Sequence, residues 1–66
     1  MNVTLNGTPA ELRDGATIMD VLERLELPDR GVAVAVDAEV VPRGQWPATP
    51  LHDGARIEVV QAVQGG

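Results

Sequence analysis

One segment of the chain carries apolar residues at helical spacing. Between residues 17 and 26, the apolar positions follow an i, i+3, i+4, i+7 pattern: Ile18, Val21, Leu22 and Leu25. The opposite face carries Glu23, Arg24 and Glu26. Thr17 and Asp20 resemble a capping box in which Asp replaces the usual Glu, and Pro28 cannot continue a helix. The pattern predicts one helix that begins at Thr17, packs its apolar stripe on the core and ends before Pro28.

Five short segments have the alternation or the β-branched content of strands. They are residues 3–5, 10–13, 32–36, 39–41 and 56–60. Asn6 and Gly7 suit the positive-φ positions of a type I′ turn, so we expect the first two segments to form a hairpin. The segment 32–36 alternates valine with alanine, so both of its faces are apolar. We therefore expect this strand near the middle of a sheet.

The order of these elements predicts the fold class. Residues 43–51 include prolines at 47 and 50 and are predicted to form an irregular crossing loop. Two strands, a helix, two strands, a crossing loop and a final strand is the order of the ubiquitin-like β-grasp. We expect an α+β fold with a mixed sheet of four to five strands packed on one helix and with the last strand central. Residues 1–61 should form this domain, and residues 62–66 a flexible C-terminal tail.

Two valine doublets in the strands predict an apolar outer surface. They are Val40 with Val41 and Val59 with Val60. Consecutive strand residues point to opposite faces, and a single helix covers only one face of the sheet. One valine of each doublet should therefore face away from the core. We interpret these outward valines as a possible docking surface for a partner protein.

Length and charge narrow the classes of function. The chain has 66 residues and a formal net charge of −5, from ten acidic residues and five arginines. A domain of this size buries only about 60% of its unfolded surface, which leaves no room for an enclosed active site. The acidic charge disfavours nucleic acid and anionic membranes and favours a basic protein partner. The sequence shows no signal peptide or membrane span, so we expect a cytoplasmic protein.

Some reactive side chains are missing. The chain contains neither cysteine nor lysine. Without cysteine it can form no disulfide and has no thiol nucleophile, and without lysine no side chain can accept an isopeptide bond. His52 is the single histidine, so the usual ligands of a zinc site and the residues of a serine triad are incomplete. We interpret His52 as an ordinary loop residue and expect no metal site.

The last two residues, Gly65 and Gly66, are the strongest functional signal in the sequence. Glycine has no Cβ, so its backbone can enter a narrow slot in any conformation. We expect Gly66 to present a free carboxylate that another protein activates as an acyl group, and Gly65 to fit the slot that leads to that active site. A frayed terminus and a truncated linker are the alternative interpretations.

The second half of the chain resembles the ThiS-type sulfur carriers of bacterial thiamine biosynthesis, and the first half resembles them in layout. The residues that carry the resemblance are Ala33 through Val41, Pro42, Arg43, Gln45, Trp46, Asp53, Gly54, Gln61, Gly65 and Gly66. The chain length agrees with this family as well. The related small subunit of molybdopterin synthase shares the fold and the tail, but it is usually longer and does not typically show the loop with proline, arginine and tryptophan.

The resemblance implies a carrier protein and not an enzyme. A ThiF-type adenylyltransferase, using ATP and magnesium, would adenylate the Gly66 carboxylate. Sulfur from a donor such as a cysteine desulfurase persulfide would then convert Gly66 to a thiocarboxylate. A ThiG-type thiazole synthase would accept this sulfur. The chain itself is expected to bind no cofactor.

Other functions remain open at this point. A molybdopterin-type carrier would use the same tail chemistry, whereas a protein modifier would form an amide between Gly66 and a lysine of another protein. A structural module would be indifferent to loss of Gly65 and Gly66. Trp46, the single aromatic residue, can cover one end of the core or contact a partner. Arg43 can pair with the acidic surface or serve as a docking contact.

Overall fold

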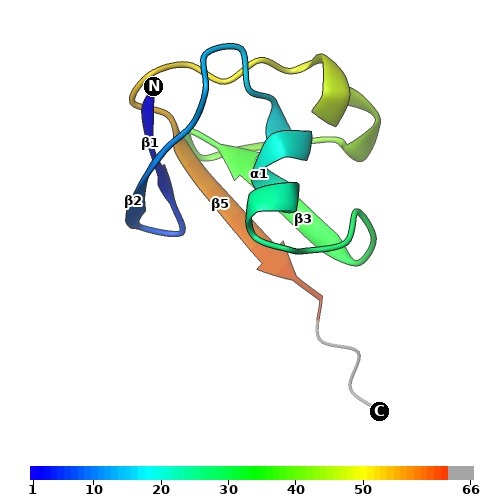
Figure 1. Cartoon of the computed structure of the whole chain (residues 1–66). Coiled ribbons are helices and arrows are strands. Elements are labelled where there is room, and N and C mark those ends of the chain that lie inside the picture. The colour runs from blue at the N-terminus through cyan, green and yellow to red at the C-terminus, as the bar shows by residue number, and fades with distance from the viewer. Residues whose placement is uncertain (63–66) are drawn as a thin grey trace.

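The computed structural model describes residues 1–62, in which a mixed sheet is covered on one face by an α-helix (Figure 1). The elements follow the predicted order. Their bounds are β1 Asn2–Leu5, β2 Thr8–Glu11, α1 Ile18–Arg24, β3 Val32–Val36, β4 Glu39–Val41 and β5 Arg56–Gln61. Each predicted strand is present, with bounds that differ by one or two residues in β1, β2 and β5.

The sheet has the strand order β2-β1-β5-β3-β4, so the last strand lies at its centre, as predicted. β5 runs parallel to β1 and antiparallel to β3, and β1–β2 and β3–β4 are hairpins. Asn6 and Gly7 have φ values of 51° and 83°, which fit the predicted type I′ turn. Asp37 and Ala38 form the second tight turn, with φ values of 51° and 68°. The two hairpins thus flank a central strand that leads directly to the C-terminal tail.

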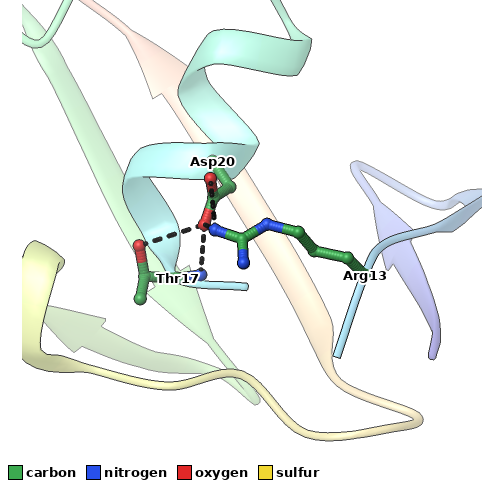
Figure 2. A network of polar contacts seen from close by, with 3 residues as sticks. All are labelled: Arg13, Thr17 and Asp20. Carbon is green, nitrogen blue, oxygen red and sulfur yellow. Dashed lines mark hydrogen bonds and ion pairs between the residues drawn. The ribbon is translucent and has the colours of Figure 1, made fainter. Parts of the chain in front are cut away.

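The start of α1 is fixed by Asp20, which folds back over the first turn (Figure 2). Asp20 Oδ2 accepts the Thr17 backbone N–H at 2.8 Å, and Arg13 donates to both carboxylate oxygens at 3.2 Å. The hydrogen bond from Thr17 and then that from Arg13 hold the pKa of Asp20 below its ordinary value. Asp therefore takes the place that Glu usually has in a capping box, as the sequence predicts.

The helix ends in a Schellman motif centred on Glu26. The Leu27 N–H donates to the Leu22 carbonyl at 2.9 Å, and the Glu26 N–H donates to the Glu23 carbonyl at 3.0 Å. Glu26 has a φ of 57°, in the left-handed region. The expectation that Glu26 lies on the exposed face of the helix is therefore wrong, because the helix has already ended at the C-cap residue Leu25.

The segment predicted to be an irregular crossing loop contains a short 3₁₀-helix, η1, at Arg43–Ala48. Proline is compatible with this helix because its fixed φ lies within the 3₁₀ range, so Pro47 fits inside η1. The Gln45 N–H donates to the Pro42 carbonyl at 2.9 Å, and the Thr49 hydroxyl donates to the Gln45 carbonyl at 2.7 Å. Proline content therefore excluded an α-helix here but not a 3₁₀-helix.

The core lies between the inner face of the sheet, α1 and η1. The buried apolar residues are Val3, Leu5, Leu12, Ala16, Ile18, Val21, Leu22, Val34, Trp46, Leu51, Ala55, Ile57 and Val59. The predicted helix stripe is confirmed, with Ile18, Val21 and Leu22 buried and Leu25 packed at the edge of the core. Among residues 1–62, no helix is long and apolar enough to cross a membrane. The same residues contain no cluster of His, Cys, Asp and Glu that could hold a metal ion.

Candidate functional site: the base of the C-terminal tail

The candidate site begins where β5 ends. Gln61 pairs with Val32 of β3, and the Ala62 N–H donates to the Gly31 carbonyl at 2.6 Å. The backbone is therefore held against β3 through Ala62, the first residue of the predicted tail. Gly65 and Gly66 lie outside the described residues, so their predicted roles remain predictions. What the structure describes is the body of the domain up to Ala62 (Figure 1).

A side chain extends the sheet on the other side of β5. β1 pairs with β5 only at Thr4–Arg56 and Leu5–Ile57, after which the chain turns away at Asn6. Asn6 Oδ1 then accepts the Val59 N–H at 2.8 Å, where a continuing strand would supply a backbone carbonyl. From the sequence, Asn6 was expected to serve only in the turn. Asn rather than Gly at the first turn position was the available signal, because Asn adds a hydrogen-bond acceptor.

The two valine doublets divide between the faces of the sheet as predicted. Val40 and Val60 are 71% and 65% exposed, whereas Val59 is 8% exposed and Val41 packs against the core. The outer valines stand opposite alanines of β3, in the pairs Ala35–Val40 and Ala33–Val60. Of the four valines proposed for docking, the structure therefore leaves Val40 and Val60 accessible. These two residues with Ala33 and Ala35 are called the outer patch below.

One end of the outer patch adjoins the tail base. A shallow groove of about 350 Å³ is lined by Gly31, Val32, Ala33, Val60 and Ala62. Its lining is apolar apart from the backbone, and it includes the last described residue before the tail. A partner that grips the outer patch would therefore hold the origin of the tail as well.

Trp46 and Arg43 have intramolecular partners. Trp46 is 2% exposed, and its indole N–H donates to the Val41 carbonyl at 2.8 Å, so the ring closes one end of the core and fixes η1 on β4. The Arg43 guanidinium lies 3.3 Å from the Asp29 carboxylate, and both side chains are exposed. Burial removes the Trp46 ring from contact with a partner, whereas Arg43 remains accessible.

His52 takes part in a polar network at the opposite end of β5. Its Nε2 lies 2.6 Å from Asp37 Oδ2, and its Nδ1 lies 2.8 Å from the Asp53 carbonyl. Asp37 Oδ1 also accepts the Arg56 N–H at 3.0 Å. The Asp37 carboxylate, followed by the Asp53 carbonyl, raises the pKa of His52 above its ordinary value. The Arg56 N–H and then His52 hold the pKa of Asp37 below its ordinary value.

This network joins the β3–β4 turn to the loop before β5. We expected His52 to be an ordinary loop residue and did not expect it to make these contacts. Asp37 and His52 are 15 residues apart, and nothing in the local pattern of either residue indicates that the turn and the loop meet. The signal that was available was the position of Asp37 in a tight turn, where an Asx side chain commonly accepts hydrogen bonds.

Comparison with known proteins agrees with this geometry. A family model described as the ThiS family matches residues 3–66. The sulfur carrier protein ThiS of Thermus thermophilus is 42% identical over 64 residues, which cover 97% of this chain and 98% of that protein. A thiazole synthase of Magnetococcus marinus is 36% identical over 66 residues, which cover 100% of this chain but 20% of that protein.

A solved structure supports the fold assignment. The crystal structure of the thiamine biosynthesis protein ThiS from Geobacter metallireducens superposes with a TM-score of 0.83 at 29% sequence identity. The superposition covers 100% of both chains. The predicted β-grasp, with its mixed sheet on one helix, is confirmed.

Proposed function

The chain belongs to the ThiS family, and on this basis we propose that it is a sulfur carrier in thiamine biosynthesis, acted on by partner enzymes. The observation that carries the proposal is the extent of the family match, which continues through Gly65 and Gly66. The position of β5 supports it, because a central strand gives the tail a fixed origin. A carrier needs no enclosed active site, which agrees with a domain of this size.

The chemistry that we propose takes place on the Gly66 carboxylate. A carboxylate at neutral pH is a poor electrophile because it has no good leaving group. A ThiF-type adenylyltransferase would transfer AMP from ATP to this carboxylate, with magnesium on the phosphates and release of pyrophosphate. A persulfide sulfur, from a donor such as a cysteine desulfurase, would attack the acyl carbon and release AMP. Reductive cleavage of the S–S bond by a thiol would leave a thiocarboxylate on Gly66.

We propose a ThiG-type thiazole synthase as the acceptor of this sulfur and as the protein that binds the outer patch. The Magnetococcus marinus thiazole synthase supports this choice, because a segment of it matches the whole of this chain. The groove beside Val60 supports it as well, because a protein bound there would hold the tail base at Ala62. Docking through an apolar patch gains free energy when the partner excludes water from the valines.

The proposal is tested with a matched pair of glycine substitutions and one deletion. A Cβ added at Gly44 meets no atom within 4 Å, so Gly44→Ala is a control that should leave sulfur loading unchanged. Gly65→Ala should slow sulfur loading because its Cβ obstructs the slot of the activating enzyme, and deletion of Gly66 should abolish it. Each protein is incubated with ATP, magnesium, an adenylyltransferase, a sulfur donor and a thiol reductant. Intact mass then reports the replacement of one oxygen by sulfur.

The outcomes separate the proposed function from its alternatives. A chain that lacks both glycines and still acquires sulfur, or still restores thiazole synthesis, would contradict the proposal. An amide between Gly66 and a lysine of another protein would indicate a protein modifier. If the wild type acquires no sulfur and loss of both glycines leaves thiazole synthesis unchanged, the chain is a structural module.

A further inference from the structure

An activated Gly66 is an electrophile, so every nucleophile on the same chain is a potential acceptor of its acyl group. The sequence contains no lysine, cysteine, serine or tyrosine. The remaining candidates are the Met1 amine, the His52 imidazole and four threonine hydroxyls. A hydroxyl is a weak nucleophile unless an adjacent base activates it. The Met1 amine and the His52 imidazole are therefore the two groups on this chain that could most readily accept the Gly66 acyl group.

The Met1 amine is held at the start of β1 by two acceptors. It donates to the Leu12 carbonyl at 2.7 Å and lies 3.6 Å from Asp14 Oδ1. β1 runs parallel to β5, so these contacts keep the amine at the end of the sheet where β5 starts.

The His52 ring is held at both nitrogens. One nitrogen faces the Asp37 carboxylate and the other faces the Asp53 carbonyl, at 2.6 and 2.8 Å. These two contacts hold the ring beside the β3–β4 turn, next to the start of β5.

The position of both groups prevents their attack on the Gly66 acyl group. Both groups lie at the end of the sheet where β5 starts, because the Gly54 N–H donates to the Asn2 carbonyl and His52 contacts the turn beside Arg56. The tail leaves from the other end, about 20 Å away along β5 at the usual rise of a strand. Four residues beyond Ala62 span at most about 14 Å when extended. Attack within one molecule is therefore out of reach for either group.

We propose that this carrier is inert toward attack on its activated terminus by groups of the same molecule, because it lacks the common acyl acceptors and holds Met1 and His52 far from the tail. The reaction avoided is attack of an amine on the Gly66 acyl carbon, which forms an amide, expels the leaving group and releases a proton to water. An activated Gly66 then reacts only with water or with a nucleophile supplied by another molecule. This inference rests on the proposed activation of Gly66.

The test uses a chemically activated chain, so that it does not depend on the adenylyltransferase. The full chain is prepared with a Gly66 α-thioester by thiolysis of an intein fusion and incubated alone near pH 7.5. Arg30→Lys is the informative variant, because residue 30 is exposed and precedes Gly31, whose carbonyl binds the Ala62 N–H. It adds an amine beside the tail base without a change in charge. Arg30→Gln is the control without an amine.

The wild type and Arg30→Gln should lose the thioester only to hydrolysis. Arg30→Lys should convert it to a cyclic amide at least about tenfold faster than the wild type does, because the new amine lies beside the tail base and within reach of the terminus. His52→Gln and an N-acetylated chain should behave as the wild type does. Intact mass separates the products, since amide formation expels the thiol whereas hydrolysis also adds water.

Two results would overturn the inference. One is slower loss of the thioester in His52→Gln or in the N-acetylated chain, which would show that these groups do react in the wild type. The other is no more amide from Arg30→Lys than from the wild type. A separate incubation with ATP and an adenylyltransferase tests the proposed function itself, so failure there leaves the thioester result interpretable.

Discussion

The two ends of β5 differ in how they are held. At its start, Arg56 and Ile57 pair with β1 on one side, and Ile57 also pairs with β3 on the other. At its end, Val60 and Gln61 pair with β3 alone. Between them, the Asn6 side chain holds Val59 on the β1 side. Support for the central strand therefore decreases stepwise toward the tail.

This gradient relates stability to function within one strand. The start of β5 contributes a buried side chain to the core, and the end presents Val60 to solvent beside the groove at the tail base. Val60 can therefore change for binding at little cost in stability, whereas Ile57 cannot. The predictions below test this difference by substitutions along β5 and at the groups that hold it.

The largest loss of stability is expected at the start of the strand. Ile57 is 1% exposed and is paired on both sides. Ile57→Ala should lower the free energy of unfolding by about 2–5 kcal/mol through lost burial and the cavity that remains. Urea unfolding measures the change, with Val60→Ala as the control on the same strand. Similar losses for the two variants would show that the two ends of β5 are held alike.

A smaller loss is expected at Asn6. Asn6→Gly keeps the positive φ of the turn but removes the acceptor of the Val59 N–H, which should cost about 0.5–1.5 kcal/mol. Asn6→Asp retains an acceptor and should lose less. Hydrogen exchange at the Val59 amide is the specific readout, because its protection should fall in Asn6→Gly more than that of the Ile57 amide. Unchanged protection of Val59 would show that β3 alone holds this end.

At the exposed end, a substitution should affect binding far more than folding. Val60→Asp should change the free energy of unfolding by no more than about 0.5 kcal/mol, because the side chain is largely solvated. Its affinity for a ThiG-type thiazole synthase should fall by about tenfold or more. Thr8→Asp adds the same charge at the exposed start of the edge strand β2 and serves as the control. If both variants bind alike, net charge and not the outer patch governs docking.

Local patterns predicted most of the fold. The helix stripe beginning at Ile18, the Asn6-Gly7 turn and the alternation in β3 each follow from spacing within a few residues, and each is present in the structure. The central place of β5 followed from the element order. One valine of each doublet was predicted to face outward, because successive strand residues point to opposite faces, and the structure shows that these are Val40 and Val60.

What the sequence could not predict depends on contacts between distant segments. Asn6 accepts a hydrogen bond from the Val59 N–H, although the two residues are 53 positions apart. The contact between His52 and Asp37 joins two loops. Neither pair has a local signature, because each residue type is ordinary in a turn or loop. The Glu26 conformation was missed for another reason. The helical spacing continues to Leu25, but the Schellman motif ends the helix before Glu26 and without the usual glycine.

The smallest effect is expected at the network that joins the β3–β4 turn to the loop before β5. Asp37 and His52 are exposed, and exposed ion pairs contribute little to stability. His52 has a pKa raised above 6.5 in the folded state, so its contribution is fully present below that value and is lost as the pH rises through the raised pKa. Asp37 has a pKa lowered below 3.8, so its contribution is present above 3.8 and is lost as the pH falls through the lowered pKa. The pair therefore stabilises the fold most between these two ordinary values.

His52→Gln isolates this contribution, because Gln keeps a neutral hydrogen-bonding group but cannot titrate. The melting temperatures of wild type and variant should differ most near pH 5.5, inside that window, and should converge as the pH rises through the raised pKa. Subtracting the melting temperature of the variant from that of the wild type at each pH removes the effect of the other carboxylates, because they titrate in both proteins. A difference that stays constant from pH 5.5 to pH 9 would mean that the His52–Asp37 contact acts as a neutral hydrogen bond. It would then hold the start of β5 without regard to the charge of the ring.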